Sequence, residues 1–205
     1  MSHRSRRTGC MFLPRRCVLC RRSGAALCAS CAAGLVPGPR GPIPAAYTYV
    51  GPARQALAAL KFRDARAIVP VLASAMAVLV PAEVDMVTWA PTSASRRRVR
   101  GFDQAELLAR AVARERGLPC RRLLVRVGHS RAQTGRGRAA RLEGPAFRAV
   151  RPISHRVLVV DDVVTTGSTL ARATEALYAA GAPLTSCVAA AATPYLRGST
   201  APGRS

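Results

Sequence analysis

The chain has 205 residues, which allows one full-sized domain and a small additional module. Hydrophobic residues make up 49% of it and no apolar run reaches the roughly 18 residues needed to cross a bilayer, so composition favours a globular protein and argues against membrane insertion. The charge balance is unusual, because 32 Lys and Arg against 10 Asp and Glu give a net charge of +22, which favours anionic partners such as a nucleotide, pyrophosphate or nucleic acid.

Part of this charge has a simpler explanation. Nearly all of the basic residues are arginines in a chain rich in Ala, Gly and Pro, a pattern typical of GC-rich codon usage. Codon usage does not explain the shortage of acids, so some preference for anions remains. The basic residues 2–7 are followed by cysteines and prolines instead of the apolar core of a signal peptide, and we therefore expect a cytoplasmic protein.

Two C-x-x-C pairs lie in residues 10–36, which we predict to be a separate module. Its candidate metal ligands are Cys17, Cys20, Cys28 and Cys31. Four thiolates at this spacing form a closed tetrahedral site for structural Zn²⁺, and the metal would supply the folding energy that so short a segment lacks. An iron–sulfur cluster or a redox-active pair are the alternatives.

Residues 37–44 are rich in Pro and Gly and predict a linker, after which residues 45–195 form the main domain. Residues 46–50 alternate like an edge strand, and residues 54–65 follow a helical pattern. That helix carries Lys61, the only lysine in the chain. Its retention against a background of arginine suggests a function, although a single residue also survives by chance.

Residues 84–90 predict a second strand, followed by a basic loop over residues 92–104. Asp103 is the expected N-cap of the helix after the loop, and Arg100 and Gln104 are candidate ligand-binding residues. Cations and small hydroxyls at the carboxyl end of a strand suit a pyrophosphate. The alternative is an ordinary solvated basic loop.

Residues 123–127 and 147–150 predict short strands, and the segment between them is full of Gly, Arg, Ser and Thr. We interpret it as a loop that closes over a diphosphate, with Gln133 as a substrate-binding candidate, or that lies along a nucleic acid strand. Composition does not choose between the two.

The most informative stretch begins with four apolar β-favouring residues, 157–160, which predict a buried parallel strand. Asp161 and Asp162 follow, and a polar loop leads into a predicted helix at 170–177. The loop residues are Thr165, Thr166, Gly167, Ser168 and Thr169. Unpaired amides at a helix N-terminus bind phosphate, while two acids suit sugar hydroxyls or Mg²⁺. Helix capping is the plainer alternative, but it accounts for only one acid or one hydroxyl.

Strands that alternate with helices in this way predict an α/β fold with a mostly parallel sheet, completed by a strand at 187–192. In such a sheet the loops after two strands meet at one crevice. We therefore expect the Asp161 loop and the Arg100 loop to share a ligand. Residues 198–205 are expected to be a disordered tail.

The stretch from Asp161 to Thr169 resembles the signature of the type I phosphoribosyltransferases, and the whole pattern resembles the ComF (competence) family. The family resemblance covers roughly residues 15–193 and also includes the cysteine pairs, residues 60–62 and 100–104, and Arg126 with Gln133. It implies a phosphoribosyltransferase-like domain behind a zinc ribbon. The acids would hold the ribose hydroxyls of phosphoribosyl pyrophosphate (PRPP) with Mg²⁺, and the loop would hold its 5′-phosphate.

The same resemblance implies that Lys61 and Arg100 contact the diphosphate or the acceptor, with Asp161 and Asp162 as the other catalytic candidates. The family usually has Asn where this chain has Asp103, which places an acid near the loop expected to bind the diphosphate. The family's link to natural transformation leaves other functions open: a sensor of ribose phosphates, a single-stranded DNA-binding protein of the competence machinery, or a zinc-held scaffold with a vestigial site.

Overall fold

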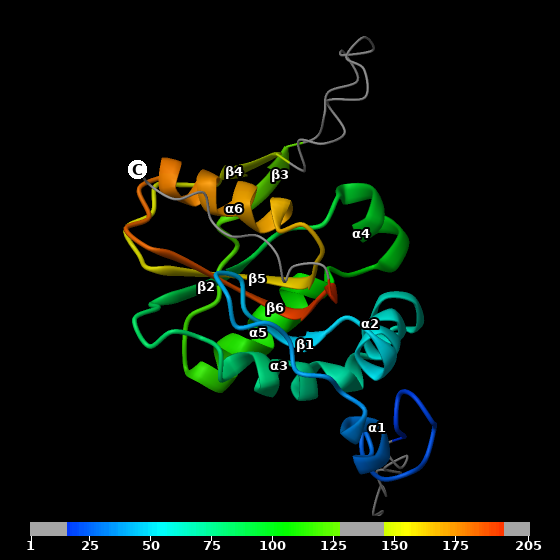
Figure 1. The fold of residues 1–205 in the computed structure, drawn as a ribbon. Helices are drawn as coiled ribbons and strands as arrows, with labels where there is room; N and C mark the ends of the chain where they lie inside the picture. Colours follow the sequence, from blue (N-terminus) through cyan, green and yellow to red (C-terminus); the bar gives the residue numbers. More distant parts are fainter. Residues whose placement is uncertain (1–15, 128–145, 195–205) are drawn as a thin grey trace, which may run out of the picture.

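The computed structural model describes residues 16–127 and 146–194 (Figure 1). The helices in these ranges are α1 (Ala29–Ala33), α2 (Gly51–Arg63), the short 3-10 helix η1 (Arg66–Ile68), α3 (Val69–Ala77), α4 (Ala94–Arg100), α5 (Gln104–Arg116) and α6 (Ser168–Ala179). The strands are β1 (Ala45–Thr48), β2 (Met86–Trp89), β3 (Leu124–Val127), β4 (Ala146–Ala149), β5 (Val157–Val164) and β6 (Thr185–Ala192).

The central sheet has the strand order β1-β6-β5-β2, and every neighbouring pair is parallel. The predicted α/β class with a parallel sheet is confirmed, and β1 lies at an edge as expected. The last strand, β6, lies between β1 and β5. Because the strands are parallel, the segments that follow β2 and β5 emerge side by side at one end of the sheet.

Helices α3 and α5 cover one face of this sheet, and α6 with the antiparallel pair β3–β4 covers the other (Figure 1). The side chains of β5 alternate between the two cores. Leu158 and Val160 pack on the side of α3 and α5, whereas Val157 and Val159 pack on the side of α6. Burial on both faces explains why the sequence of this strand is continuously apolar.

The strand β5 is longer than the sequence indicates. It continues to Val164, with Asp161 opposite Ala189 and Val163 opposite Ala191 of β6. The two acids therefore belong to the end of the strand and not to the loop after it. Backbone pairing with β6 sets this boundary, because ladder hydrogen bonds do not depend on side-chain polarity.

The basic segment 92–104, predicted as a loop, contains the helix α4. The Oγ of Ser93 accepts a hydrogen bond from the backbone N–H of Arg96 at 3.3 Å and caps the helix. Gly101 ends it in the left-handed region, at φ 77°. The predicted cap of the next helix is confirmed, since Asp103 accepts from the N–H of Ala105.

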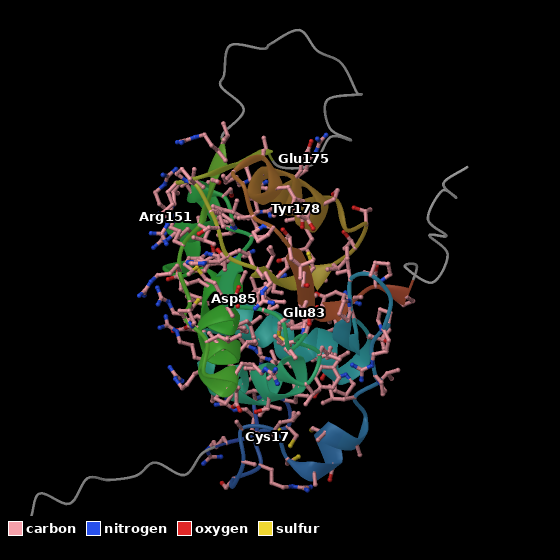
Figure 2. The ribbon with its side chains drawn as sticks, turned by 90° about the vertical axis from the view of Figure 1, so that its left-hand side faces the viewer. Cys17, Glu83, Asp85, Arg151, Glu175 and Tyr178 are labelled. Atoms are coloured by element: carbon pink, nitrogen blue, oxygen red, sulfur yellow. The ribbon has the colours of Figure 1, made fainter. Side chains whose placement is uncertain are left out.

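The cysteine-containing segment forms a small unit below the main body, where Figure 2 labels Cys17. Cys17 is fully buried, and with Val18 and Leu27 it packs into the core on the α3 side of the sheet. The Pro/Gly segment 37–44 runs along β1, since the N–H of Gly38 donates to the carbonyl of Ala46 at 3.1 Å. A side chain at Gly38 would collide with backbone carbonyls of β1.

Two sequence expectations fall outside the described residues: the loop after β3, including Gln133, and the tail at 198–205. Within the described ranges, no helix combines the length and the apolar character that a membrane crossing requires.

Candidate functional site

A cavity of about 320 Å³ lies where β2 and β5 end. Asp161 and Asp162 line it from the last part of β5. The backbone N–H of Asp162 donates to Oδ1 of Asp161 at 2.8 Å, and the N–H of Val163 donates to Oδ1 of Asp162 at 2.8 Å. These bonds orient both carboxylates by means of the strand itself.

The acidic pair is electrostatically strained. Burial, and then the adjacent charge of Asp162, raise the pKa of Asp161 well above its ordinary value. The Nζ of Lys61 lies 2.8 Å from Oδ2 of Asp162. Lys61, which lies on α2, thereby compensates part of the negative charge of Asp161 and Asp162.

Three arginines complete the charged wall: Arg96 and Arg100 of α4, and Arg126 of β3. Burial, followed by the charge of Arg96, lowers the pKa of Arg126. Guanidinium groups that crowd together in a partly buried cavity favour an anionic ligand, because an anion would relieve their mutual repulsion.

Gln104, at the start of α5, is only 2% exposed and lines the same cavity. Its Oε1 accepts a hydrogen bond from Nη1 of Arg100 at 3.2 Å. Among the described residues its Nε2 has no partner, although the atom is buried. An orphaned buried donor is costly, so this group is suited to an acceptor atom of a ligand.

Asp103 does not present a free carboxylate to this cavity. Its Oδ1 accepts from the N–H of Ala105 at 3.1 Å and its Oδ2 from the N–H of Thr92 at 2.8 Å. Burial raises the pKa of Asp103, although these backbone hydrogen bonds act to lower it. The acid thus ties the end of β2 to the start of α5.

The loop after β5 leads directly into α6. Gly167 adopts φ 79° and is the N-cap of that helix. Thr165 and Thr169 line the cavity. The Oγ1 of Thr166 donates to Oγ of Ser168 at 3.0 Å and accepts a long contact of 3.4 Å from the backbone N–H of Ser168. The first amides of the 12-residue helix have no partners within it and lie at its positive end.

The sequence-derived candidates therefore divide into three groups. Seven line the cavity: Lys61, Arg100, Gln104, Asp161, Asp162, Thr165 and Thr169. Thr166, Gly167 and Ser168 lie in the adjoining loop but outside the lining. Gln133 lies outside the described residues.

Sequence reasoning missed some of the wall. Tyr49, which follows β1, and Thr92, which follows β2, line the cavity but are not among the predicted site residues. Arg96 stands in a run of arginines from which the sequence does not single it out, and Arg126 is named only through the family resemblance. Position just after a parallel strand is the signal that Tyr49 and Thr92 share with the Asp161 loop.

The four module cysteines converge on one point, because their Sγ atoms all lie within 4.8 Å of one another. The Sγ atoms of Cys20 and Cys28 are 3.6 Å apart. A tetrahedral zinc with Zn–S bonds of about 2.3 Å places its sulfurs about 3.8 Å apart, so the cluster fits a Zn²⁺ ion.

The thiols are also unequal in acidity. Burial opposes the ionisation of Cys17, but backbone hydrogen bonds from Cys28, Cys20 and Leu19 outweigh it and lower its pKa to about 6. Hydrogen bonding to Cys28 raises the pKa of Cys31 to about 12. A cation among the sulfurs would favour the thiolate form of all of them.

Comparison with known families agrees with this geometry. The family of the phosphoribosyl transferase domain matches residues 105–201, just under half of the chain, and this segment includes all but the first residue of α5, together with β5, the Asp161 loop and α6. Residues 105–201 are thus similar to the phosphoribosyl transferase domain, and the four-cysteine cluster lies ahead of this matched segment.

Solved structures similar to this chain include the following two. One is the glutamine PRPP amidotransferase of B. subtilis in complex with ADP and GMP, with 24% identity and a TM-score of 0.44 over 62% of this chain. This chain spans about a quarter (26%) of that protein. The other is the purine phosphoribosyltransferase of Pyrococcus horikoshii, with 18% identity and a TM-score of 0.41, covering 62% of this chain and 74% of that one. No curated protein matches the sequence.

Proposed function

We propose that the protein binds PRPP, or the related ribose 5-phosphate, together with Mg²⁺, and that it transfers the phosphoribosyl group to an acceptor with release of pyrophosphate. One observation carries the proposal: a single cavity is lined by two adjacent carboxylates, by hydroxyl residues at the N-terminus of α6, and by three arginines. A phosphorylated ribose with a diphosphate needs all three kinds of group.

The division of labour follows from the chemistry of each wall. Carboxylates only accept hydrogen bonds, so Asp161 and Asp162 suit the ribose 2′- and 3′-hydroxyls. The amides and hydroxyls of the loop from Thr165 to Thr169 suit the 5′-phosphate, which the positive end of α6 also attracts. The acids themselves would repel that phosphate, which fixes the direction in which the sugar lies.

The opposite wall is suited to the diphosphate. In the transfer, the C1′–O bond breaks and its electron pair leaves with pyrophosphate, while a lone pair of the acceptor forms the new bond to C1′. Arg96 and Arg100 would stabilise the charge that develops on the departing oxygens, and the free Nε2 of Gln104 would donate to one of them. The Nζ of Lys61 lies 2.8 Å from Oδ2 of Asp162. On ligand binding, Lys61 would leave Asp162 and contact the diphosphate instead.

Asp161 and Asp162 are the residues that would hold Mg²⁺, whose charge would assist the departure of pyrophosphate. The oxygen-only donor set of the two acids is of the kind that this ion prefers.

Calorimetric titration with PRPP, with and without Mg²⁺, tests the proposal. Wild-type protein should bind with a heat signal that Mg²⁺ strengthens, and the double variant Asp161→Asn/Asp162→Asn should show none. The variant Asp85→Asn, which changes an acid at the other end of β2, is the matched control and should bind like the wild type. Equal binding by the double variant would refute the site. Pyrophosphate release with candidate acceptors then separates an enzyme from a sensor.

A second candidate is a non-catalytic role with single-stranded DNA in natural competence, as the resemblance to the ComF family suggests. The run of arginines in α4, within a chain of net charge +22, favours it. The 4% aromatic content gives little for bases to stack on. Binding of a labelled oligonucleotide across a salt series tests it, because phosphate contacts require affinity to fall steeply as salt rises.

A further inference from the structure

A second cavity, of about 480 Å³, lies beside the first, between the end of α2 and the helix α4. Both helices lie at the same end of the molecule in Figure 1. Lys61, Arg96 and Arg100 line both cavities and form a shared wall. A molecule in the second cavity would thus adjoin whatever occupies the first.

The floor of the second cavity is apolar and exposed. Phe62 is 74% exposed and Val99 is 88% exposed, and both line the hollow. Isolated apolar residues on a surface are ordinary, but two large ones that face one cavity indicate a binding surface. The guanidinium of Arg100 lies 5.5 Å from the centre of the Phe62 ring, which brings a cation and an aromatic face together.

The rim is cationic and its charge is not neutralised. Within the described ranges, Arg63, Arg96 and Arg100 form no ion pair with a carboxylate. The acid in the wall, Asp64, is already paired with Arg66 at 2.6 Å. An occupant with a negative charge would therefore be favoured over a neutral one of the same shape.

We infer that this second cavity is the acceptor pocket, and that the acceptor is a planar aromatic anion of one or two rings. The inference rests on the proposed function, since it assigns the neighbouring cavity to PRPP. A flat ring would stack against Phe62, and its anionic group would meet Arg63 or Arg96. The volume lies in the range of about 300–1,000 Å³ that is usual for small-molecule pockets.

The same features argue against nucleic acid as the occupant. A strand needs a succession of stacking surfaces along a basic groove. Here one exposed ring, Phe62, lines the hollow, and the other aromatic in its wall, Phe102, is already covered by Arg66, whose guanidinium lies 4.7 Å from the ring centre.

Three probes test the class of ligand: benzoate, benzamide as its neutral counterpart, and cyclohexanecarboxylate as the anion without a flat ring. Ligand-observed NMR with the full chain, in the presence of PRPP and Mg²⁺, gives the affinities, which are millimolar for fragments of this size. Benzoate should bind at least several-fold more tightly than either counterpart. Equal binding of the three, or no binding of benzoate, overturns the assignment.

Two variants with matched controls locate the site. Phe62→Ala and Arg96→Ala should each weaken benzoate binding about tenfold, the loss expected of one stacking or charged contact. Val78→Ala removes an equally exposed apolar side chain from outside the cavity, and Arg97→Ala removes a neighbouring charge of α4 that does not line it. Both controls should bind benzoate like the wild type.

PRPP titration of the same variants distinguishes the two proposals. If Phe62→Ala binds PRPP normally and the wild-type protein does not bind benzoate, the acceptor assignment is wrong while the proposed PRPP site stands. If no form binds PRPP, the proposed function fails with it. If Phe62→Ala instead weakens binding of an oligothymidylate and leaves benzoate unaffected, the pocket serves nucleic acid and the inference is wrong.

Discussion

At the scale of single residues, Gln104 carries more information than its position in the sequence suggests. The guanidinium of Arg100 only donates, so the contact at 3.2 Å must be to Oε1 of Gln104, and Nε2 is the atom left buried without a partner in the described structure. A donor held this way lowers stability in the free protein and becomes satisfied when a ligand supplies an acceptor.

The substitution Gln104→Met separates these two effects. Affinity for PRPP should fall about tenfold, as expected for the loss of one hydrogen bond to a charged ligand. The thermal midpoint should stay level or rise, since an unsatisfied amide is replaced by an apolar chain of similar size. Calorimetry and thermal unfolding measure the two quantities. A lower midpoint with unchanged affinity would make Gln104 a structural residue only.

At the scale of elements, the amino ends of β2 and β5 are joined by an ion pair at the end of the sheet away from the site. Asp85, labelled in Figure 2, precedes β2. Its Oδ1 lies 2.7 Å from Nη2 of Arg156, and its Oδ2 accepts from Nε at 3.0 Å. The side-chain and backbone hydrogen bonds of Arg156 lower the pKa of Asp85 to about 2.

This pair predicts a pH dependence. A carboxyl group with a lowered pKa in the folded state stabilises the fold above its unfolded pKa of about 3.9, and that stability is lost as pH falls toward 2. Urea midpoints of Asp85→Asn should therefore lie below those of the wild type at pH 6 and converge with them near pH 2. The matched variant Glu83→Gln should follow the wild type throughout. A gap that persists at pH 2 would mean that packing, not charge, links the strands.

At the scale of the whole molecule, the cysteine unit is continuous with the main core. Cys17, Val18 and Leu27 pack in the same cluster as residues of α2 and α3. Loss of a metal from the cluster should therefore loosen the adjoining part of the domain as well as the unit itself.

Zinc removal tests this coupling. Purified protein should contain one zinc per chain by mass spectrometry, and chelation or Cys20→Ser should remove the metal and lower the thermal midpoint. A loss of about 1 kcal/mol corresponds to about 2–4 °C in a chain of this size. Cys120→Ser, which changes a cysteine outside the cluster, should keep its zinc. Iron in the purified protein, or a thermal midpoint that the chelator leaves unchanged, would contradict the zinc assignment.

Local sequence predicted that a buried strand, a polar loop and a helix follow one another at β5 and α6, and that four cysteines lie at metal-ligand spacing. These features depend on residues that are neighbours along the chain. Local sequence misjudged two boundaries. The acids at 161 and 162 extend a strand that pairing with β6 prolongs, and a cap at Ser93 with a stop at Gly101 turns an apparent loop into α4.

The composition of the site was decided by tertiary structure. Tyr49, Thr92, Arg126 and the Asp161 loop come from four separated segments, and only the parallel strand order brings them to one cavity. The second cavity exists because the end of α2 and the helix α4 line the same hollow, an arrangement that no local pattern specifies. Periodicity reports the neighbours of a residue along the chain, whereas a binding site depends on which distant segments the folded core holds together.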